Sequence, residues 1–180
     1  DALPILLSQA EHDPRARAIM VTNSEKLANL VSDEVERQLS QLPRESIARP
    51  AIENNSYIAV MNSVEDMFTV MNEVAPEHLE IQLPDPMEYM SMVENAGSVF
   101  LGRYASEPLG DYVGGTNHVL PTSGTAKFSS PLGVYDFVKR ISFTQFSRER
   151  LQEVAKDITT LARTEGLEAH ARAIEVRFEK

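Results

Sequence analysis

The sequence predicts an α/β fold in which an at least partly parallel sheet is followed by C-terminal helices. Short apolar runs alternate with amphipathic helical patterns up to about residue 102, and such alternation favours an α/β sheet over a helix bundle or a β-sandwich. Turn-forming residues replace these patterns from Gly102 to Gly133, and two further helical patterns end the chain.

The region up to residue 102 contains the elements of the predicted sheet. The first helix, residues 3–13, has apolar residues at helical spacing and ends at Asp13-Pro14, because proline cannot continue a helix. A longer helix is expected over residues 22–42, with Ser24 as its N-cap. The remaining elements are strands over residues 16–22, 56–61 and 98–102 and a helix over residues 63–75.

The stretch from Gly102 to Gly133 is too long for an ordinary connection inside a compact domain. Irregular stretches of this kind are more often functional, although a mobile surface linker remains the alternative. The sequence then predicts a strand or extended arm over residues 134–147. Two amphipathic helices follow, over residues 148–166 and 167–180.

Composition excludes several classes of protein and site. The 180 residues carry a formal net charge of −10 and contain no basic run, which argues against a nucleic-acid partner because such partners require clustered Lys and Arg. The absence of cysteine excludes disulfides, thiolate zinc sites and thiol nucleophiles, and suits the cytoplasm. No apolar stretch is long enough for a membrane span, and the N-terminal stretch has no basic leader of a signal peptide. Because the chain begins at Asp1 rather than Met, we expect a fragment or a processed product.

The histidines suggest a metal site. Gln9 and His12 are three residues apart on a predicted helix, so they face the same way and could bind one ion. Glutamine is a weak ligand, so the pair would need a carboxylate, which Asp111 could supply, and another imidazole, which His170 could supply. Taken singly, each histidine is better explained as an ordinary surface or core-edge residue, and only the set of four points to a site.

Glu77 and His78 form a second candidate group. An adjacent carboxylate and imidazole can exchange a proton, which suits a reaction that removes a hydroxyl proton and later activates water. The alternative is a structural strand in which Glu77 and Glu80 face solvent and His78 stacks on a neighbour. No glycine-rich phosphate-binding motif is present.

Five ordered blocks carry a resemblance to a known family. They are "LLSQAEHDP", "VAPEHLEIQL", "NAGSVFLG", "GDYVGGTNHVLPTSGTAKFSSPLGVYDFVKR" and "EGLEAHARAIEVR". Together they closely resemble the C-terminal part of histidinol dehydrogenase, a zinc-dependent, NAD-linked oxidoreductase of histidine biosynthesis. The family is more than twice as long as this chain and has an upstream region, with much of the nucleotide-binding part, that is absent here. Thr116 stands where the family pattern leads us to expect proline.

The resemblance implies a role for each matching residue. The zinc ligands, which would also contact the substrate, would be Gln9, His12, Asp111 and His170. The catalytic acid/base pair would be Glu77 and His78. Further substrate contacts would come from His118 and Glu165, and His78 would contact the substrate as well. The implied reaction is the four-electron oxidation of L-histidinol to L-histidine through the aldehyde, the last step of this amino-acid biosynthesis, with Zn²⁺ and NAD as cofactors. No NAD-contacting residue is assigned.

The resemblance also implies an incomplete Rossmann-like, aldehyde-dehydrogenase-like layered domain with a C-terminal helical arm. Residues 1–131 would be the α/β domain with most metal and catalytic residues, and residues 132–180 a dimerising arm. We expect a cytoplasmic homodimer with exchanged arms that binds neither nucleic acid nor membrane. Two alternatives remain: a metal-binding or dimerisation fragment without catalysis of its own, and a zinc hydrolase using Glu77, against which the lack of an H-E-x-x-H helix counts.

Overall fold

The structure, a computed structural model, describes residues 3–179, so Asp1, Ala2 and the end of the last predicted helix at Lys180 lie outside it. The chain forms two compact units, Asp1–Phe137 and Val138–Lys180. We call them the first and second units and describe each by itself.

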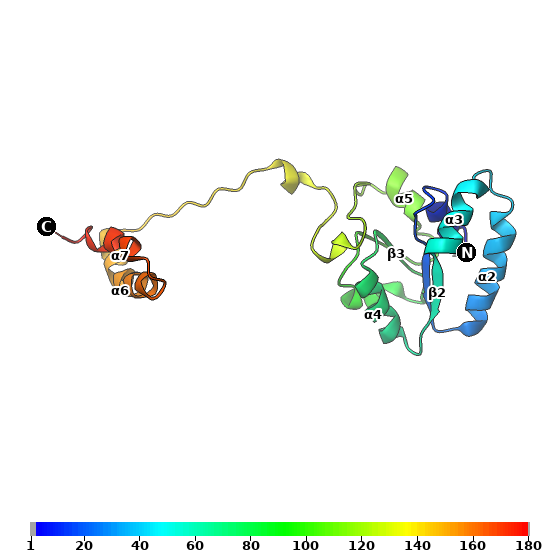
Figure 1. The fold of residues 1–180 in the computed structure, drawn as a ribbon, viewed down its shortest axis with the longest axis horizontal. Helices are drawn as coiled ribbons and strands as arrows, with labels where there is room; N and C mark the ends of the chain where they lie inside the picture. Colours follow the sequence, from blue (N-terminus) through cyan, green and yellow to red (C-terminus); the bar gives the residue numbers. More distant parts are fainter. Residues whose placement is uncertain (1–2, 180) are drawn as a thin grey trace. The chain divides into compact units, whose positions relative to one another are not determined.

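The first unit contains four short strands in two parallel pairs (Figure 1). They are β1 (Ile19–Thr22), β2 (Tyr57–Val60), β3 (His78–Ile81) and β4 (Ser98–Leu101). Ile19 lies opposite Tyr57 in the β1–β2 pair, and His78 lies opposite Ser98 in the β3–β4 pair. The predicted α/β class with parallel pairing is therefore confirmed.

Helices connect these strands and form the whole of the regular structure in the second unit. The α-helices are α1 (Leu3–Ala10), α2 (Glu25–Leu39), α3 (Glu45–Asn55), α4 (Val64–Val74), α5 (Glu107–Tyr112), α6 (Arg148–Thr164) and α7 (Glu168–Glu175). The 3₁₀ turns are η1 (Pro86–Met92), η2 (Thr125–Lys127) and η3 (Val134–Phe137).

Local sequence signals account for several helix boundaries. The Ser24 hydroxyl accepts a hydrogen bond from the N–H of Leu27 at 3.2 Å, which confirms it as the N-cap of α2. Ser63 caps α4 in the same way through the N–H of Asp66. The α4 helix ends at Ala75, which has a left-handed backbone with φ of 49°.

Three expectations about local structure are corrected. The first helix ends at Ala10, so His12 lies in the turn beyond it. The α5 helix begins inside the supposedly irregular stretch. Of the strand or extended arm expected over residues 134–147, the strand is absent: the segment contains η3 and then runs without regular structure to α6.

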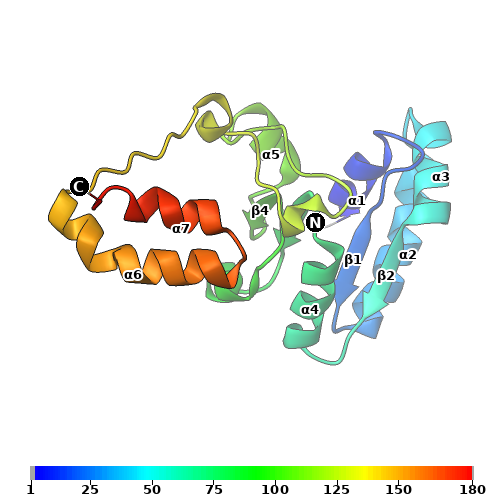
Figure 2. The same cartoon turned by 60° about the vertical axis from the view of Figure 1, so that its left-hand side comes forward.

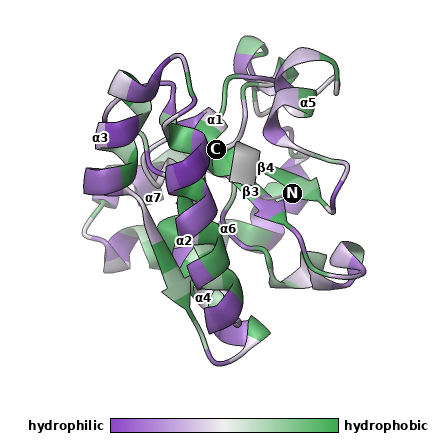
Figure 3. Ribbon diagram, turned by 90° about the vertical axis from the view of Figure 1, so that its right-hand side faces the viewer, coloured by the Kyte–Doolittle hydropathy of each residue, from purple (hydrophilic) through white to green (hydrophobic). Residues whose placement is uncertain are grey.

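Two separate hydrophobic clusters pack the helices of the first unit against its strands. The first cluster joins α1, α2 and α3 through seven buried residues: Leu7, Ala10, Val31, Val35, Leu39, Ala48 and Ala51. Met20 of β1 and Ile58 of β2 pack against it. The second cluster packs Phe68 of α4 against Leu79 and Ile81 of β3, and the rings of Phe68 and Tyr89 stack at 5.8 Å. Figure 3 shows hydrophilic positions along α2 and α3, as expected for helices with one buried face.

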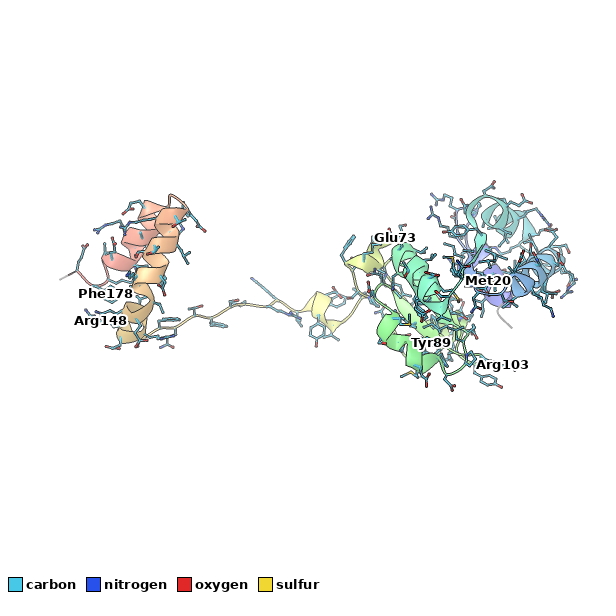
Figure 4. All side chains as sticks on the ribbon, turned by 90° about the horizontal axis from the view of Figure 1, so that it is seen from below. Met20, Glu73, Tyr89, Arg103, Arg148 and Phe178 are labelled. Carbon is cyan, nitrogen blue, oxygen red and sulfur yellow. The ribbon has the colours of Figure 1, made fainter. Side chains whose placement is uncertain are left out.

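The second unit is a hairpin in which α6 and α7 lie side by side (Figure 2). Arg163 joins the two helices through ion pairs with Glu168 at 2.8 Å and Glu175 at 2.9 Å. The Arg148 guanidinium lies 5.4 Å from the centre of the Phe178 ring, where Figure 4 labels both residues. Within the described residues, no helix is both long and apolar enough to cross a membrane.

We predict that Leu39→Ala lowers the free energy of unfolding by about 2–5 kcal/mol, because the side chain is fully buried and its loss leaves a cavity. Leu30→Ala on the same helix is the matched control, since Leu30 is 55% exposed. It should change the free energy by about 0.5 kcal/mol. Urea denaturation of both variants checks this, and equal losses would contradict the described core.

Candidate functional site

The candidate site begins with the alternation of side chains along β3. Leu79 and Ile81 are buried in the cluster with α4, so His78 and Glu80 point to the opposite face of the strand. The His78 ring is half-buried, 6.2 Å from the ring of Phe100 on β4. A strand is therefore present here, as expected if these residues had only a structural role. Glu80, however, is partly buried and does not simply face solvent.

A close approach of two backbones fixes the start of β3. The N–H of Gly97 donates to the carbonyl of Pro76, and the N–H of Ser98 donates to that of Glu77, both at 2.9 Å. A Cβ atom on Gly97 would lie only 2.6 Å from the Glu77 carbonyl oxygen. Only glycine therefore allows β4 to enter so close to Glu77 and His78.

The short helix α5 brings two carboxylates to the same face. Glu107 and Asp111 are four residues apart and so lie on one side of the helix. The N–H of Glu107 donates to the Glu80 carboxylate at 3.1 Å, which ties the first turn of α5 to β3. Gly110 lies against Phe100, where a Cβ atom would be 2.7 Å from the ring. The helix is thereby held flat against β4.

Three side chains meet where α5 faces β3. A ring nitrogen of His78 and carboxylate oxygens of Glu107 and Asp111 lie within 4.8 Å of one another. Among residues 3–179, these three side chains form a group that could hold a metal ion. His118 joins this group from the following loop, with its Nδ1 atom 2.9 Å from the Asp111 carboxylate. Next to it, the Asn117 side chain accepts the N–H of Val119 at 2.7 Å, a local turn that orients the loop.

The pKa values of the ionisable groups in this cluster are shifted in different directions. Burial, then hydrogen bonding to Asp111 and the charges of Asp111 and Glu80, raise the pKa of Glu107 to about 7. Burial would also raise the pKa of Asp111, but hydrogen bonds from His118 and Glu107 outweigh it and lower that pKa. The same bond to Asp111 raises the pKa of the exposed His118 imidazole.

His78 is held in its neutral form. Burial lowers the pKa of its imidazole, although the charges of Glu77 and Asp111 oppose this, while His118 and His12 lower it further. Its Nε2 atom is buried and has no hydrogen-bond partner in the described part of the chain. A buried polar atom without a partner is uncommon, so this nitrogen is available to a ligand or a proton.

These residues open onto a cavity of about 1010 Å³ within the first unit. Gln9, Glu77, His78 and Glu107 line it. His12 is near enough for its charge to affect the His78 imidazole. The structure thus gathers Gln9, Glu77 and His78 around one cavity and joins Asp111 and His118 to them.

The two other predicted site residues belong to the second unit. Glu165 follows α6, and His170 lies on α7, where both are exposed. Sequence reasoning missed Glu107 and Glu80. The available signal for Glu107 was its spacing of four residues from Asp111, just after Ser106, a residue type common at helix N-termini.

The donor set fits a divalent metal ion. It offers an imidazole nitrogen without a partner and two neighbouring carboxylates, and nitrogen and oxygen ligands suit zinc. This grouping shares only Asp111 with the ligand set that the resemblance implies. Gln9 and His12 lie nearby as further nitrogen and oxygen donors.

Comparison with known proteins gives consistent matches along nearly the whole chain. Residues 5–178 match the protein family described as "Histidinol dehydrogenase". The histidinol dehydrogenase of Lactiplantibacillus plantarum is 65% identical over 174 residues, and that of Streptococcus mutans is 62% identical over 175 residues. Each alignment covers 97% of this chain but 41% of the relative, so the chain spans about two-fifths of these relatives.

A solved structure gives the same result. The crystal structure of histidinol dehydrogenase from Elizabethkingia anophelis is similar with a TM-score of 0.88 and 38% sequence identity. The similarity covers 99% of this chain and 41% of that one.

We predict that Gly97→Ala destabilises the first unit by about 1–3 kcal/mol, because its Cβ atom must displace the backbone at Glu77. The NMR signals of the His78 ring should shift as well. Gly133→Ala is the control, since the nearest atom to its Cβ lies 3.9 Å away. Wild-type stability and unchanged His78 signals in Gly97→Ala would contradict the described close approach.

Proposed function

Because the chain belongs to the histidinol dehydrogenase family, we propose that it forms the metal-binding and acid–base part of an enzyme that oxidises L-histidinol to L-histidine. The observation that carries this proposal is the half-buried His78 beside Glu77: burial keeps its imidazole neutral by lowering its pKa, its Nε2 atom has no partner among the described residues, and the ring lies in one group with the carboxylates of Glu107 and Asp111. Such a pair is suited to proton transfer near neutral pH.

We assign zinc to Gln9, His12, Asp111 and His170. Support within the first unit comes from Gln9 in the cavity wall, His12 near His78, and the carboxylate of Asp111 in the group with His78 and Glu107. The fourth ligand would come from α7 of the second unit. When bound, zinc would orient the substrate, and two molecules of NAD⁺ in turn would each accept one hydride.

The chain's own residues would handle the protons. His78 is unprotonated, so its ring can take the alcohol proton as the first hydride leaves and the aldehyde forms. Glu77 would then take a proton from the water that attacks the aldehyde. Loss of the second hydride leaves the carboxylate of histidine. His118 and Glu165 would contact the substrate.

We further propose a homodimer in which the second unit serves the partner's site. The segment that leads to α6 supports this, because its apolar side chains are exposed: Val138 50%, Ile141 64%, Phe143 91% and Phe146 51%. Exposed apolar groups in a row are typical of a surface that another chain covers. The absence of cysteine and the net charge of −10 fit a cytoplasmic enzyme without a nucleic-acid partner.

The function is tested by NADH production from histidinol with zinc. In the full-length protein, Glu77→Gln and His78→Asn should each lower kcat by about 10²–10⁴-fold, whereas Glu94→Gln, an exposed carboxylate, should not. The 180-residue chain alone should produce little NADH, because a hydride needs an acceptor held close to the substrate. Ester hydrolysis without NAD would contradict the proposal and favour a hydrolase.

Mixed dimers test the ligand set and the arm exchange together. His12→Ala and His170→Ala should each weaken zinc binding at least about tenfold, whereas Glu11→Ala should not. If the arms cross, a mixed dimer of the two variants has one site with all four ligands and one that lacks two, so some affinity returns. If His170 serves its own chain, every site lacks one ligand and mixing recovers nothing.

A further inference from the structure

The helix α5 has little in its own sequence that stabilises it. It contains six residues, with Pro108 in its first turn and Gly110 in its interior, and glycine is one of the weakest helix formers. Ser106 occupies the N-cap position, but its side chain makes no capping hydrogen bond, whereas Ser63 caps α4. The position of α5 therefore depends on contacts from outside the helix.

Glu80 supplies the missing cap from the neighbouring strand. The N–H of Glu107, the first residue of α5, donates to the Oε1 atom of Glu80 at 3.1 Å. The Oε2 atom of Glu80 accepts from the Nε2 atom of Gln82 at 3.0 Å. A side-chain oxygen that accepts one of the first N–H groups of a helix satisfies the same need as an N-cap. Here that oxygen comes from β3 rather than from the helix's own first turn.

The middle of α5 has a contact of a different kind. A Cβ atom on Gly110 would lie 2.7 Å from the ring of Phe100, so the ring limits how closely the helix approaches β4. Such packing has no preferred direction, whereas a hydrogen bond does. The bond from Glu107 to Glu80 is therefore the contact that fixes where α5 lies along β3.

The spacing of residues connects this bond to the metal-compatible group. His78 and Glu80 lie on one face of β3 and are two residues, about 7 Å, apart. Glu107 and Asp111 lie on one side of α5 and are four residues, about 6 Å, apart. With Glu107 bonded to Glu80, Asp111 is brought to His78, and their ligand atoms lie within 4.8 Å. A shift of α5 at Glu80 would move Asp111 relative to His78.

We propose that Glu80 is a positioning residue for the metal site: by capping α5 from β3, it sets the place of the Asp111 carboxylate relative to His78. Its consequence for zinc rests on the proposed function, in which Asp111 is a ligand. Glu80 is assigned no contact with metal or substrate and acts through α5. Replacing a residue that only holds a ligand in place typically lowers metal affinity by about 10–100-fold.

Two substitutions of Glu80 separate the reach of its oxygen from its charge. Glu80→Gln removes the charge but keeps an oxygen within reach of Glu107, and the amide of Gln82 can turn to offer its own oxygen to the new amide group. Glu80→Asp keeps the charge but withdraws the oxygens by one carbon–carbon bond, about 1.5 Å, too far for the bond to Glu107. Gln82→Met is the matched control, because it removes only the other bond to Glu80.

Zinc affinity, measured in the full-length protein by competition with a chelator, tests the proposal. Glu80→Asp should weaken zinc binding at least about tenfold, whereas Glu80→Gln and Gln82→Met should stay within about threefold of the wild type. Saturating zinc should restore most of the kcat of Glu80→Asp, because Glu77 and His78 are unchanged. It should not restore Glu77→Gln, which lacks a group that moves protons. This difference separates a positioning residue from a catalytic one.

Hydrogen exchange of the Glu107 amide, measured by NMR in the zinc-free full-length protein, gives a second test. This amide loses its acceptor in Glu80→Asp alone, so it should exchange at least about tenfold faster in that variant. The Asp66 amide, which Ser63 caps in α4, is the internal control. A wild-type protein that bound no zinc would contradict the proposed function, and the exchange of Glu107 would then decide whether Glu80 positions α5.

Three results would overturn the proposal. Wild-type zinc affinity and Glu107 exchange in Glu80→Asp would mean that α5 keeps its place without the cap. A tenfold loss of affinity in Glu80→Gln would mean that the charge matters rather than the acceptor. An equal loss in Gln82→Met would mean that any change at this end of β3 disturbs the site. If Glu80→Asp does not fold, Glu80→Gln decides: wild-type affinity supports the proposal and a tenfold loss overturns it.

Discussion

The site depends on the alternation of side chains along four residues of β3. Leu79 and Ile81 must be buried against α4, and this burial forces His78 and Glu80 to the other face of the strand. Glu80 then binds the first N–H of α5, and α5 in turn presents Glu107 and Asp111. A shift of one residue in the β3 register would bury the imidazole and expose the leucine, so core packing and chemistry are set by the same constraint.

The electrostatics of the site follow from that placement. Removing carboxylates from water raises their pKa values, and crowding them together raises them further. Glu107 shows this effect, whereas Asp111 escapes it because His118 donates a hydrogen bond to it. The same burial keeps His78 neutral. A site with two close carboxylates and a neutral imidazole suits both the binding of a cation and the removal of a proton, which are the two demands of the proposed oxidation.

Much of the fold could be predicted from local sequence patterns. The α2 and α6 helices have clear apolar stripes and serine caps, and these signals give their positions closely. The α3 helix carries Pro50 in its interior, and α5 carries Pro108 and Gly110, so their sequences look like turns. Tertiary contacts overrule these signals: the small Gly110 is required by Phe100, which lies ten residues earlier in the chain.

The candidate site was predictable only in part, because its members are brought together by strand pairing. The histidines and Asp111 stand out by residue type and by resemblance, but nothing local shows that Glu80 binds the backbone of Glu107. A two-stranded sheet is marginal by itself. The site is therefore held on short parallel pairs, and the pairing of β3 with β4, rather than any local pattern, determines where His78 and Glu80 point.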